Sequence, residues 1–340
     1  MPIHTVLGEL DPADLGPTSM HEHVFADLRL WAKTGPDGVP WEGPIGPEAQ
    51  MHLRWNGLHT AENLRLHDPE VAVAELQAVR AAGGGTLVDL TVVGMGRRVA
   101  DLAEVSRRSG VAIAVGCGYY VEELHPPELA TMDVDAIAAT ILAELNEGID
   151  GTGIKPALIG EIGTNHPPTE AEWRVVRAAG RAGAEAGAAV NVHLSWRGAD
   201  GVEVVEALLA EGMPADRIVL SHLDERPDRG YHEAVAATGA VIEFDTFGSE
   251  YLYSTESRAR NPTDVERLAA LEHLIAIGCG DRIVIGCDIW TQGNLLRNGG
   301  CGYEHLFRRI QPALSWACGA DEATVRQIMV ETPRRLLDRP

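Results

Sequence analysis

A short apolar run followed by an amphipathic segment of helical period is the pattern that repeats along this chain. The runs with strand character are residues 15–23, 86–91, 111–117, 157–162, 189–193, 218–222, 240–245 and 283–288. Amphipathic stretches between them include residues 70–82, 134–147, 169–186, 202–211 and 264–277. Strands that alternate with helices indicate βαβ units and a parallel sheet. Eight such units predict an α/β fold, a closed (β/α)₈ TIM barrel.

The rhythm is broken once, at residues 31–66, which are rich in Gly, Pro and Trp. We interpret residues 1–340 as one barrel domain, because such barrels reach this length without splitting. A long loop after the first strand of a barrel lies on the face that carries active sites. Residues 31–66 are therefore expected to form a lid or a substrate wall, or else an ordered excursion that only covers the barrel end.

Charge and cysteine content narrow the function classes. The chain has 28 Lys and Arg against 50 Asp and Glu, a net charge of −22, which disfavours nucleic-acid and membrane-surface partners. Residues 1–10 do not show the basic and apolar segments of a signal peptide, and no run approaches the roughly 18 apolar residues of a membrane span, so we expect a soluble cytoplasmic protein. Five cysteines without a C-x-x-C motif favour free thiols over disulfides or a cysteine-built zinc site.

Polar residues that can bind metals fall at the ends of five predicted strands. His21 and His23 end the first strand, and the others are Glu161, His193, His222 and Asp288. Side chains on a strand alternate with period two, so both imidazoles of His-x-His face the same way. A single histidine at a strand end is more often structural, but six matching residues at one barrel mouth favour metal binding.

The size of this set predicts two metal ions rather than one. Four histidines and two carboxylates exceed the needs of one tetrahedral zinc, whereas two divalent ions that share a carboxylate use them all. Such a centre activates water for hydrolysis of a small-molecule substrate. A homodimer is compatible with the sequence, which gives no test of it.

Substrate contacts are predicted less sharply. Tyr119 and Tyr120 directly follow the third strand and are expected to line a substrate pocket, with core packing an equal alternative. Arginines in or near strand-end loops are candidates for binding an anionic substrate group, and Arg297 is the one that we predict to contact the substrate. The others are Arg97, Arg98, Arg258 and Arg260, each of which has the alternative of a solvated surface residue.

Several motifs together carry a family resemblance that covers essentially the whole chain. They lie at residues 15–23 (LGPTSMHEH), 160–164 (GEIGT), 221–224 (SHLD), 244–246 (FDT) and 331–333 (ETP). On these motifs the sequence resembles the phosphotriesterase family of the amidohydrolase superfamily, in its phosphotriesterase-related branch. The resemblance implies a (β/α)₈ barrel with a binuclear metal centre, usually of zinc.

The resemblance also implies ligand roles. His21, His23 and Asp288 would hold the more buried ion, and His193 and His222 would hold the more exposed one. The best-known members bridge their metals with a carboxylated lysine, but here Glu161 stands at that strand end. Lys155 lies at the start of the strand and is poorly placed to replace it.

The expected chemistry is attack of a metal-bridging hydroxide on a carbonyl, with Asp288 as the residue that accepts the proton. Asp224 and Glu225, just past His222, are candidates to orient that ligand or to relay protons. A lactone or carboxylic ester is the first predicted substrate, and an N-acyl amide is the alternative. Thr246 stands where some phosphotriester-hydrolysing relatives carry a basic residue, so phosphotriester hydrolysis is a weaker prediction than ester or amide hydrolysis. A non-catalytic metal-binding barrel comes last, because no ligand is missing.

Overall fold

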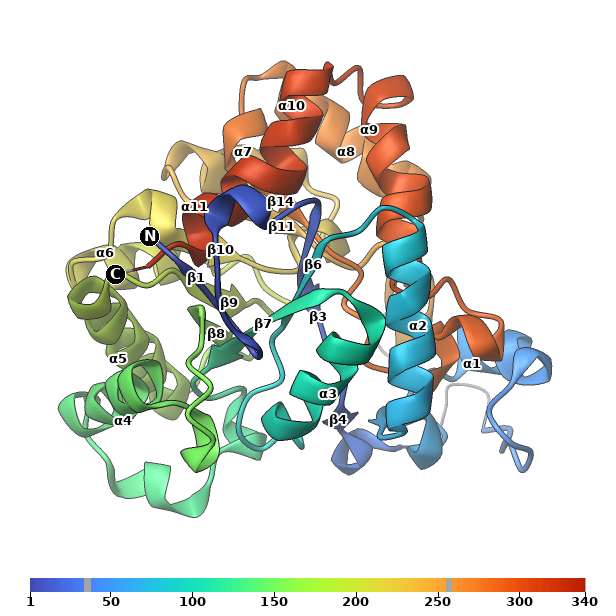
Figure 1. Ribbon diagram of the computed structural model, residues 1–340, viewed down its shortest axis with the longest axis horizontal. Coiled ribbons are helices and arrows are strands. Elements are labelled where there is room, and N and C mark those ends of the chain that lie inside the picture. The colour runs from blue at the N-terminus through green and yellow to red at the C-terminus, as the bar shows by residue number, and fades with distance from the viewer. Residues whose placement is uncertain (34–37, 255–258, 340) are drawn as a thin grey trace.

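The computed structural model describes residues 1–33, 38–254 and 259–339 and confirms the predicted barrel (Figure 1). Eight strands form one sheet in the order β14-β11-β10-β9-β8-β7-β6-β3. They are β3 (Thr18–Glu22), β6 (Thr86–Asp89), β7 (Ala112–Cys117), β8 (Leu158–Gly163), β9 (Val190–His193), β10 (Ile218–Leu220), β11 (Val241–Phe244) and β14 (Ile283–Ile285). Each lies within or overlaps a predicted run, so short apolar runs between turn residues located all eight.

The strands pair in parallel around the sheet. Val190, for example, pairs with Ile159 on one side and Ile218 on the other. β14 and β3 are the two ends of this order and lie side by side. No backbone ladder joins these two strands among the residues that the structure describes, so the barrel closes at a seam between its last and first strands.

Helices surround the sheet and connect successive strands. The helices are α1 (Gln50–Trp55), α2 (Pro69–Ala81), α3 (Val99–Ser109), α4 (Val134–Glu147), α5 (Glu170–Ala186), α6 (Gly201–Ala210), α7 (Arg229–Ala237), α8 (Asp264–Ala276), α9 (Gln311–Trp316), α10 (Glu322–Arg326) and α11 (Thr332–Leu337). Thr169 and Thr263 form capping boxes that start α5 and α8. Gly110 and Gly187 end α3 and α5 in the left-handed conformation that glycine adopts without strain.

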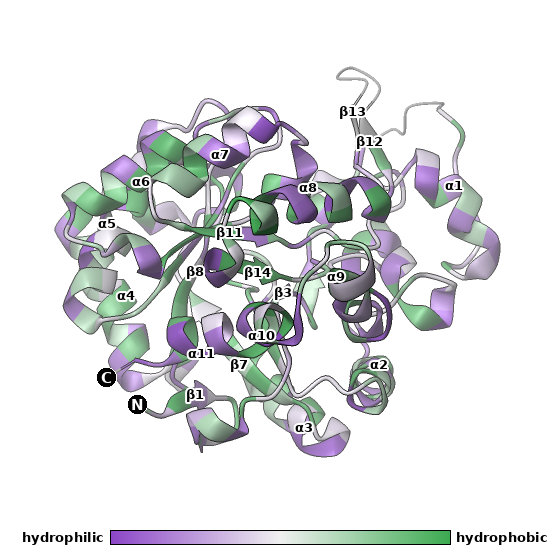
Figure 2. Cartoon of the chain, turned by 90° about the horizontal axis from the view of Figure 1, so that it is seen from above, coloured by the Kyte–Doolittle hydropathy of each residue, from purple (hydrophilic) through white to green (hydrophobic). Residues whose placement is uncertain are grey.

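The core has two layers because strand side chains alternate between the faces of the sheet. Figure 2 shows apolar strands inside a ring of helices whose outer faces are polar. One cluster takes a residue from or beside every barrel strand and fills the interior: Met20, Val88, Ala114, Leu158, Ala189, Val219, Val241 and Val284. The larger cluster packs the opposite strand faces, such as Leu87 and Ile113, against the helices. The barrel is therefore closed at its centre, and a ligand must bind at its mouth.

Three short antiparallel strand pairs flank the barrel in the described part of the chain. β1 (Ile3–Thr5) and β2 (Gly8–Leu10) pair near the strand starts, where the Met1 ammonium contacts Asp338 at 2.8 Å. β4 (Ala26–Asp27) pairs with β5 (Arg65–Leu66), which closes the excursion at residues 31–66. β12 (Leu252–Ser254) pairs with β13 (Ala259–Arg260). Among the described helices, none combines the length and the apolar character needed to cross a bilayer.

Candidate metal centre and active site

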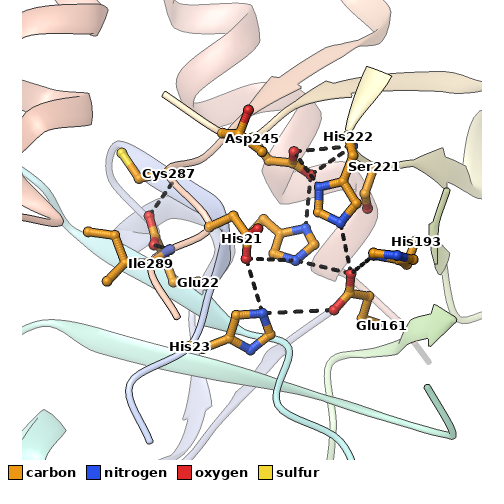
Figure 3. Close-up of polar contacts among 12 residues, drawn as sticks. His21, Glu22, His23, Glu161, His193, Ser221, His222, Asp245, Cys287 and Ile289 are labelled. Atoms are coloured by element: carbon orange, nitrogen blue, oxygen red, sulfur yellow. Dashed lines mark hydrogen bonds and ion pairs between the residues drawn. The ribbon is translucent and has the colours of Figure 1, made fainter. Parts of the chain in front are cut away.

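The six predicted ligands converge at the carboxyl ends of the strands, as Figure 3 shows for most of them. His21, His23, Glu161 and His222 are at most 5% exposed. Asp288 and His193 are less buried, with side chains 13% and 20% exposed. His222 and Asp288 follow their strands in left-handed backbone conformations, with φ of 60° and 44°. The chain thus turns sharply just past β10 and β14 and aims both side chains at the mouth.

His21 lies on β3 and His23 follows directly after it, and both side chains face the same carboxylates. The Nε2 atom of His21 lies 3.5 Å from Glu161 and 3.8 Å from Asp288. The Nε2 atom of His23 lies 3.2 Å from Asp288. His21 Nε2 is fully buried without a hydrogen-bond partner. A buried ring nitrogen aimed between two carboxylates fits a metal ligand, because burial without a partner is otherwise costly.

Glu161 joins two halves of the cluster. One oxygen lies 2.9 Å from His193 Nδ1 and 3.0 Å from His222 Nε2. The other oxygen lies 3.8 Å from His23 Nε2. A carboxylate whose two oxygens face different histidines has the geometry that a bridge between two cations requires.

Three groups among the described residues have ligand atoms close enough to hold an ion. They are His21–His23–Asp288, Glu161–His193–His222 and His21–His222–Asp245. The first two match the predicted pair of sites, with Glu161 between them. In the third group, the Asp245 carboxylate approaches both histidines at Nδ1, at 3.0 Å for His21 and 2.8 Å for His222. Asp245 therefore accepts N–H donors behind the rings and leaves each Nε2 free toward the cluster.

Asp245 was not assigned a role from the sequence, although it ends a predicted strand as the ligands do. Its carboxylate is fully buried and also accepts the His222 backbone N–H at 3.1 Å. Thr91 serves His23 in the same way, with its hydroxyl 3.0 Å from Nδ1. Each of the three most buried of the proposed ligand histidines, His21, His23 and His222, thus has a partner that fixes its ring and its tautomer.

The electrostatics of the metal-free cluster favour cations. Burial alone would lower the pKa of His21, but Glu161 and Asp245 outweigh it and raise that pKa well above its usual range. The pKa of His222 is raised in the same way, chiefly by Asp245. Burial would raise the pKa of Glu161, yet the surrounding histidines hold it well below its usual range. The carboxylates of the cluster therefore favour positive charge at these positions, which is the charge that metal ions would supply.

A cavity of about 520 Å³ opens above this cluster. It is lined by His23, Leu28, Trp31, Lys33, Leu58, Met95, Tyr120, Val121, Glu123, Glu161, Asn165, His166, Thr169, His193, Ser195, Trp196, Arg197, His222, Glu225, Asp288 and Trp290. Trp31, Lys33 and Leu58 come from the excursion at residues 31–66, which forms part of the cavity wall. Residues 34–37 of that segment lie outside the described residues. Burial raises the pKa of Glu225 to about 7.

Of the predicted substrate contacts, Tyr120 lines the cavity and its hydroxyl lies 3.0 Å from His193 Nδ1. Tyr119 does not line it, because neighbouring side chains on an extended segment point to opposite sides, and its ring packs near His125 instead. Arg297 lies on a separate depression of about 210 Å³, with its guanidinium 3.9 Å from Asp68. The sequence could place Arg297 in a strand-end loop but not orient that loop.

The other candidate arginines are also engaged elsewhere. Arg97 pairs with Glu144 and Asp150, and Arg98 lies over the Phe25 ring at 4.3 Å. Arg258 and the side chain of Arg260 lie outside the described residues. The cavity instead contains Arg197, which the sequence reasoning missed. Arg197 lies four residues after β9, so the predicted strand end that located His193 also indicated the loop that contains Arg197.

Thr246 and Asp224 have structural partners. The buried Asp224 carboxylate accepts the Thr246 hydroxyl at 2.8 Å and the Arg267 guanidinium at 2.8 Å. Neither Asp224 nor Thr246 lines the cavity. Of the two acids predicted to assist His222, only Glu225 faces the cavity, and Asp224 anchors α8 to the end of β11.

Comparison with known proteins agrees with this geometry. A model of the phosphotriesterase family matches residues 1–337. The chain belongs to the phosphotriesterase family. N-acetyltaurine hydrolase of Danio rerio is 35% identical over 98% of this chain and 97% of its own length. A resiniferatoxin-binding protein from Rhodobacter sphaeroides has a crystal structure with a TM-score of 0.95 at 34% identity, covering 99% of this chain and 95% of its own.

A lactonase from Listeria monocytogenes, Lmo2620, has a TM-score of 0.79 at 25% identity and is covered in full, as is this chain. The family and these relatives identify the chain as a metal-dependent hydrolase, as predicted. The cluster of histidines and carboxylates fits the binuclear divalent centre of the phosphotriesterase family.

Proposed function

We propose that this phosphotriesterase-family chain hydrolyses an N-acyl amide whose amine portion carries an anionic group. The observation that carries the proposal is the division of the cavity above the cluster into a mainly apolar half, with Lys33 and Glu123 as its charged residues, and a mainly polar half that contains Arg197 beside Trp196. The similarity to N-acetyltaurine hydrolases across the whole chain supports the same substrate class, since N-acetyltaurine is an amide of an aminosulfonate.

The apolar half lies over four consecutive positions around the barrel. Residues that follow β14, β3, β6 and β7 supply it: Trp290, Leu28, Trp31, Met95, Tyr120 and Val121. The Trp31 ring lies 5.7 Å from Tyr120 and 6.1 Å from Trp290, between ring centroids, so these side chains form one aromatic wall. Such a wall suits the acyl group of a substrate, because apolar contact favours burial of methylene groups.

The polar half lies over the remaining strands that face the cavity. Asn165, His166 and Thr169 follow β8, and Ser195 and Arg197 follow β9. The Arg197 guanidinium lies 4.9 Å from the centroid of the Trp196 ring, which supports it at the rim. A guanidinium presents two parallel N–H donors that match a sulfonate or a carboxylate.

The scissile carbonyl would lie between these halves, over Glu161. Two divalent ions held by His21, His23, Asp288, Glu161, His193 and His222 would supply an acidified water and polarise the carbonyl. Asp288 borders the cavity and is placed to accept a proton from that water and to return it to the departing amine. The Tyr120 hydroxyl beside His193 is placed to orient the carbonyl group. Zinc is the proposed metal, from the imidazole-rich ligand set.

A lactone or carboxylic ester is the second candidate, because the aromatic wall would accept its acyl chain equally well. The Listeria lactonase shares the fold and supports it. A phosphotriester has less support, since a neutral triester makes no use of Arg197 and Thr246 is turned away from the cavity.

The test is a comparison of kcat/KM for three N-acyl taurines of rising acyl length, the matching uncharged N-acyl ethanolamines, a lactone series and an aryl phosphotriester. Arg197→Ala is compared with Arg29→Ala, which removes an exposed arginine that pairs with Asp27 outside the cavity. We expect Arg197→Ala to raise KM about 10-fold for the taurines alone, the value of one charge-assisted hydrogen bond at an exposed rim. Equal losses for charged and uncharged amides would refute the assignment of Arg197, and a lactone as best substrate would overturn the amide assignment.

A further inference from the structure

The seam between β14 and β3 raises the question of what holds the barrel closed beside the metal cluster. No ladder joins these strands in the described part of the chain, yet Gly286 lies against the His21 backbone. A Cβ atom added at Gly286 would meet the His21 carbonyl oxygen at 2.8 Å. The two strands therefore approach closely without the regular hydrogen bonds that join the other pairs.

Two isolated backbone hydrogen bonds cross the seam, between Asp288 and His21 and between His23 and Ile289, and a side chain adds two more. Glu22 is fully buried, and one of its oxygens accepts the Cys287 backbone N–H at 3.0 Å while the other accepts the Ile289 N–H at 3.0 Å. The Ser19 hydroxyl donates to the same carboxylate at 2.7 Å. Figure 3 shows Glu22 directed toward Cys287 and Ile289, away from the histidine cluster that its neighbours His21 and His23 enter.

The two amides that Glu22 binds flank Asp288. Asp288 has φ of 44°, a left-handed conformation that is uncommon for residues other than glycine, although Asp and Asn adopt it more readily than most. Its own N–H donates to the His21 carbonyl at 3.1 Å, and the His23 N–H donates to the Ile289 carbonyl at 3.2 Å. The peptide groups on both sides of Asp288 are thus fixed from the first strand.

We propose that Glu22 is a positioning residue that holds Asp288 in this left-handed conformation, so that the Asp288 carboxylate faces His21 and His23. The His21-Glu22-His23 segment then supplies two ligands from one face of the strand, and Glu22 on the other face orients the third ligand, Asp288. Only a carboxylate of this length offers two acceptor oxygens to two diverging N–H groups. A glutamine would place its NH₂ group against one of them.

The proposed role of Glu22 concerns the metal site, so zinc binding tests it without any substrate and independently of the proposed amide hydrolysis. Zinc affinity and stoichiometry are measured by competition with a chromophoric chelator for the wild type and Glu22→Gln. The matched control is Ser19→Ala, which removes another contact of the same carboxylate but leaves both N–H groups beside Asp288 bound. We expect Glu22→Gln to weaken one of the two zinc ions by about 10- to 100-fold, as loss of a ligand-orienting group does. Ser19→Ala should stay within about 3-fold.

A double-mutant cycle separates positioning from stability of the seam. Asp288→Ala removes the side chain that Glu22 is proposed to aim, so Glu22→Gln should have little further effect on zinc affinity in that background. In turnover, Glu22→Gln should lower kcat with little change in KM, and Glu22→Asp should recover part of the loss.

Three outcomes would overturn the proposal. The first is a Glu22→Gln protein that unfolds at lower temperature but binds both zinc ions as the wild type does. The second is an effect of equal size in the Asp288→Ala background. The third is failure of both Glu22→Gln and Glu22→Asp to fold, which would assign Glu22 to closure of the barrel rather than to Asp288.

Discussion

Asp245 is the carboxylate whose removal reports most widely on the centre, because it serves one histidine of each proposed metal site. Its fully buried carboxylate accepts Nδ1–H of His222 at 2.8 Å and lies 3.0 Å from Nδ1 of His21, which also hydrogen-bonds Glu243 at 3.4 Å. Asp245→Asn keeps the size of the side chain but leaves one acceptor oxygen for two ring donors. His222 then loses its partner or turns to the tautomer that protonates Nε2, the atom needed for the metal, or else His21 keeps only the longer contact of its Nδ1 with Glu243, at 3.4 Å.

The structure sets the magnitude. A hydrogen bond to a charged group contributes about 1.5 to 3 kcal/mol, and about 1.4 kcal/mol corresponds to a tenfold change in affinity. One lost bond therefore weakens zinc at the affected site by roughly 10- to 150-fold, in line with the known effect of groups that orient ligands. Both sites are affected if the asparagine amide settles between the two rings.

The assay is zinc competition against a chromophoric chelator, with kcat/KM measured on the same preparations. Asp264→Asn is the control, because Asp264 pairs with His305 Nε2 at 2.7 Å outside the cavity lining. We expect Asp245→Asn to lose zinc affinity and activity together while Asp264→Asn keeps both. An Asp245→Asn protein that binds two zinc ions with unchanged affinity would refute the reasoning.

Four further predictions concern the cluster and the substrate. Glu161→Gln should abolish activity and release metal, measured by turnover and elemental analysis, whereas Lys155→Ala should retain both; the reverse pattern would remove Glu161 from the bridge. The raised pKa values of His21 and His222 mean that zinc displaces protons, so zinc affinity should fall as pH is lowered; proton release in weak buffer checks this, and a pH-independent affinity would contradict it. Because their pKa values are raised in the fold, protonated His21 and His222 should contribute their full stabilisation below about pH 6.5, and this contribution should be lost as the pH rises through the raised pKa values. Thermal unfolding of chelator-treated protein at several pH values measures this. Stability that rises with pH over that range would contradict it. The best carbonyl substrate should exceed an aryl phosphotriester by on the order of 100-fold in kcat/KM, and a triester that outperforms every amide and lactone would refute it.

The sequence was sufficient to predict the barrel and to place the six proposed ligands at its mouth, because both depend on local patterns. Apolar runs bounded by turn residues located every barrel strand, and a polar residue at the end of such a run is placed at the mouth by the topology. The amphipathic helices α2, α4, α5, α6 and α8 begin and end within two residues of their predicted limits. No limits were predicted for the other α-helices, which are α1, α3, α7, α9, α10 and α11.

Contacts between distant segments could not be read in this way. The roles of Asp245 and Glu22 depend on which strands face each other across the mouth and across the seam. Arg197 and Arg297 both lie in strand-end loops, and only the folded loop directs Arg197 to the cavity. Tyr119 and Tyr120 are neighbours, and the phase of the strand end decided which of them lines the cavity.

Metal stoichiometry tests the central claim most directly. The chain is purified, loaded with zinc, freed of loosely bound ions and analysed for metal per polypeptide alongside its specific activity. The account predicts that activity saturates as the content approaches two ions per chain, with Glu161 shared between them. Full activity at one ion per chain would contradict it.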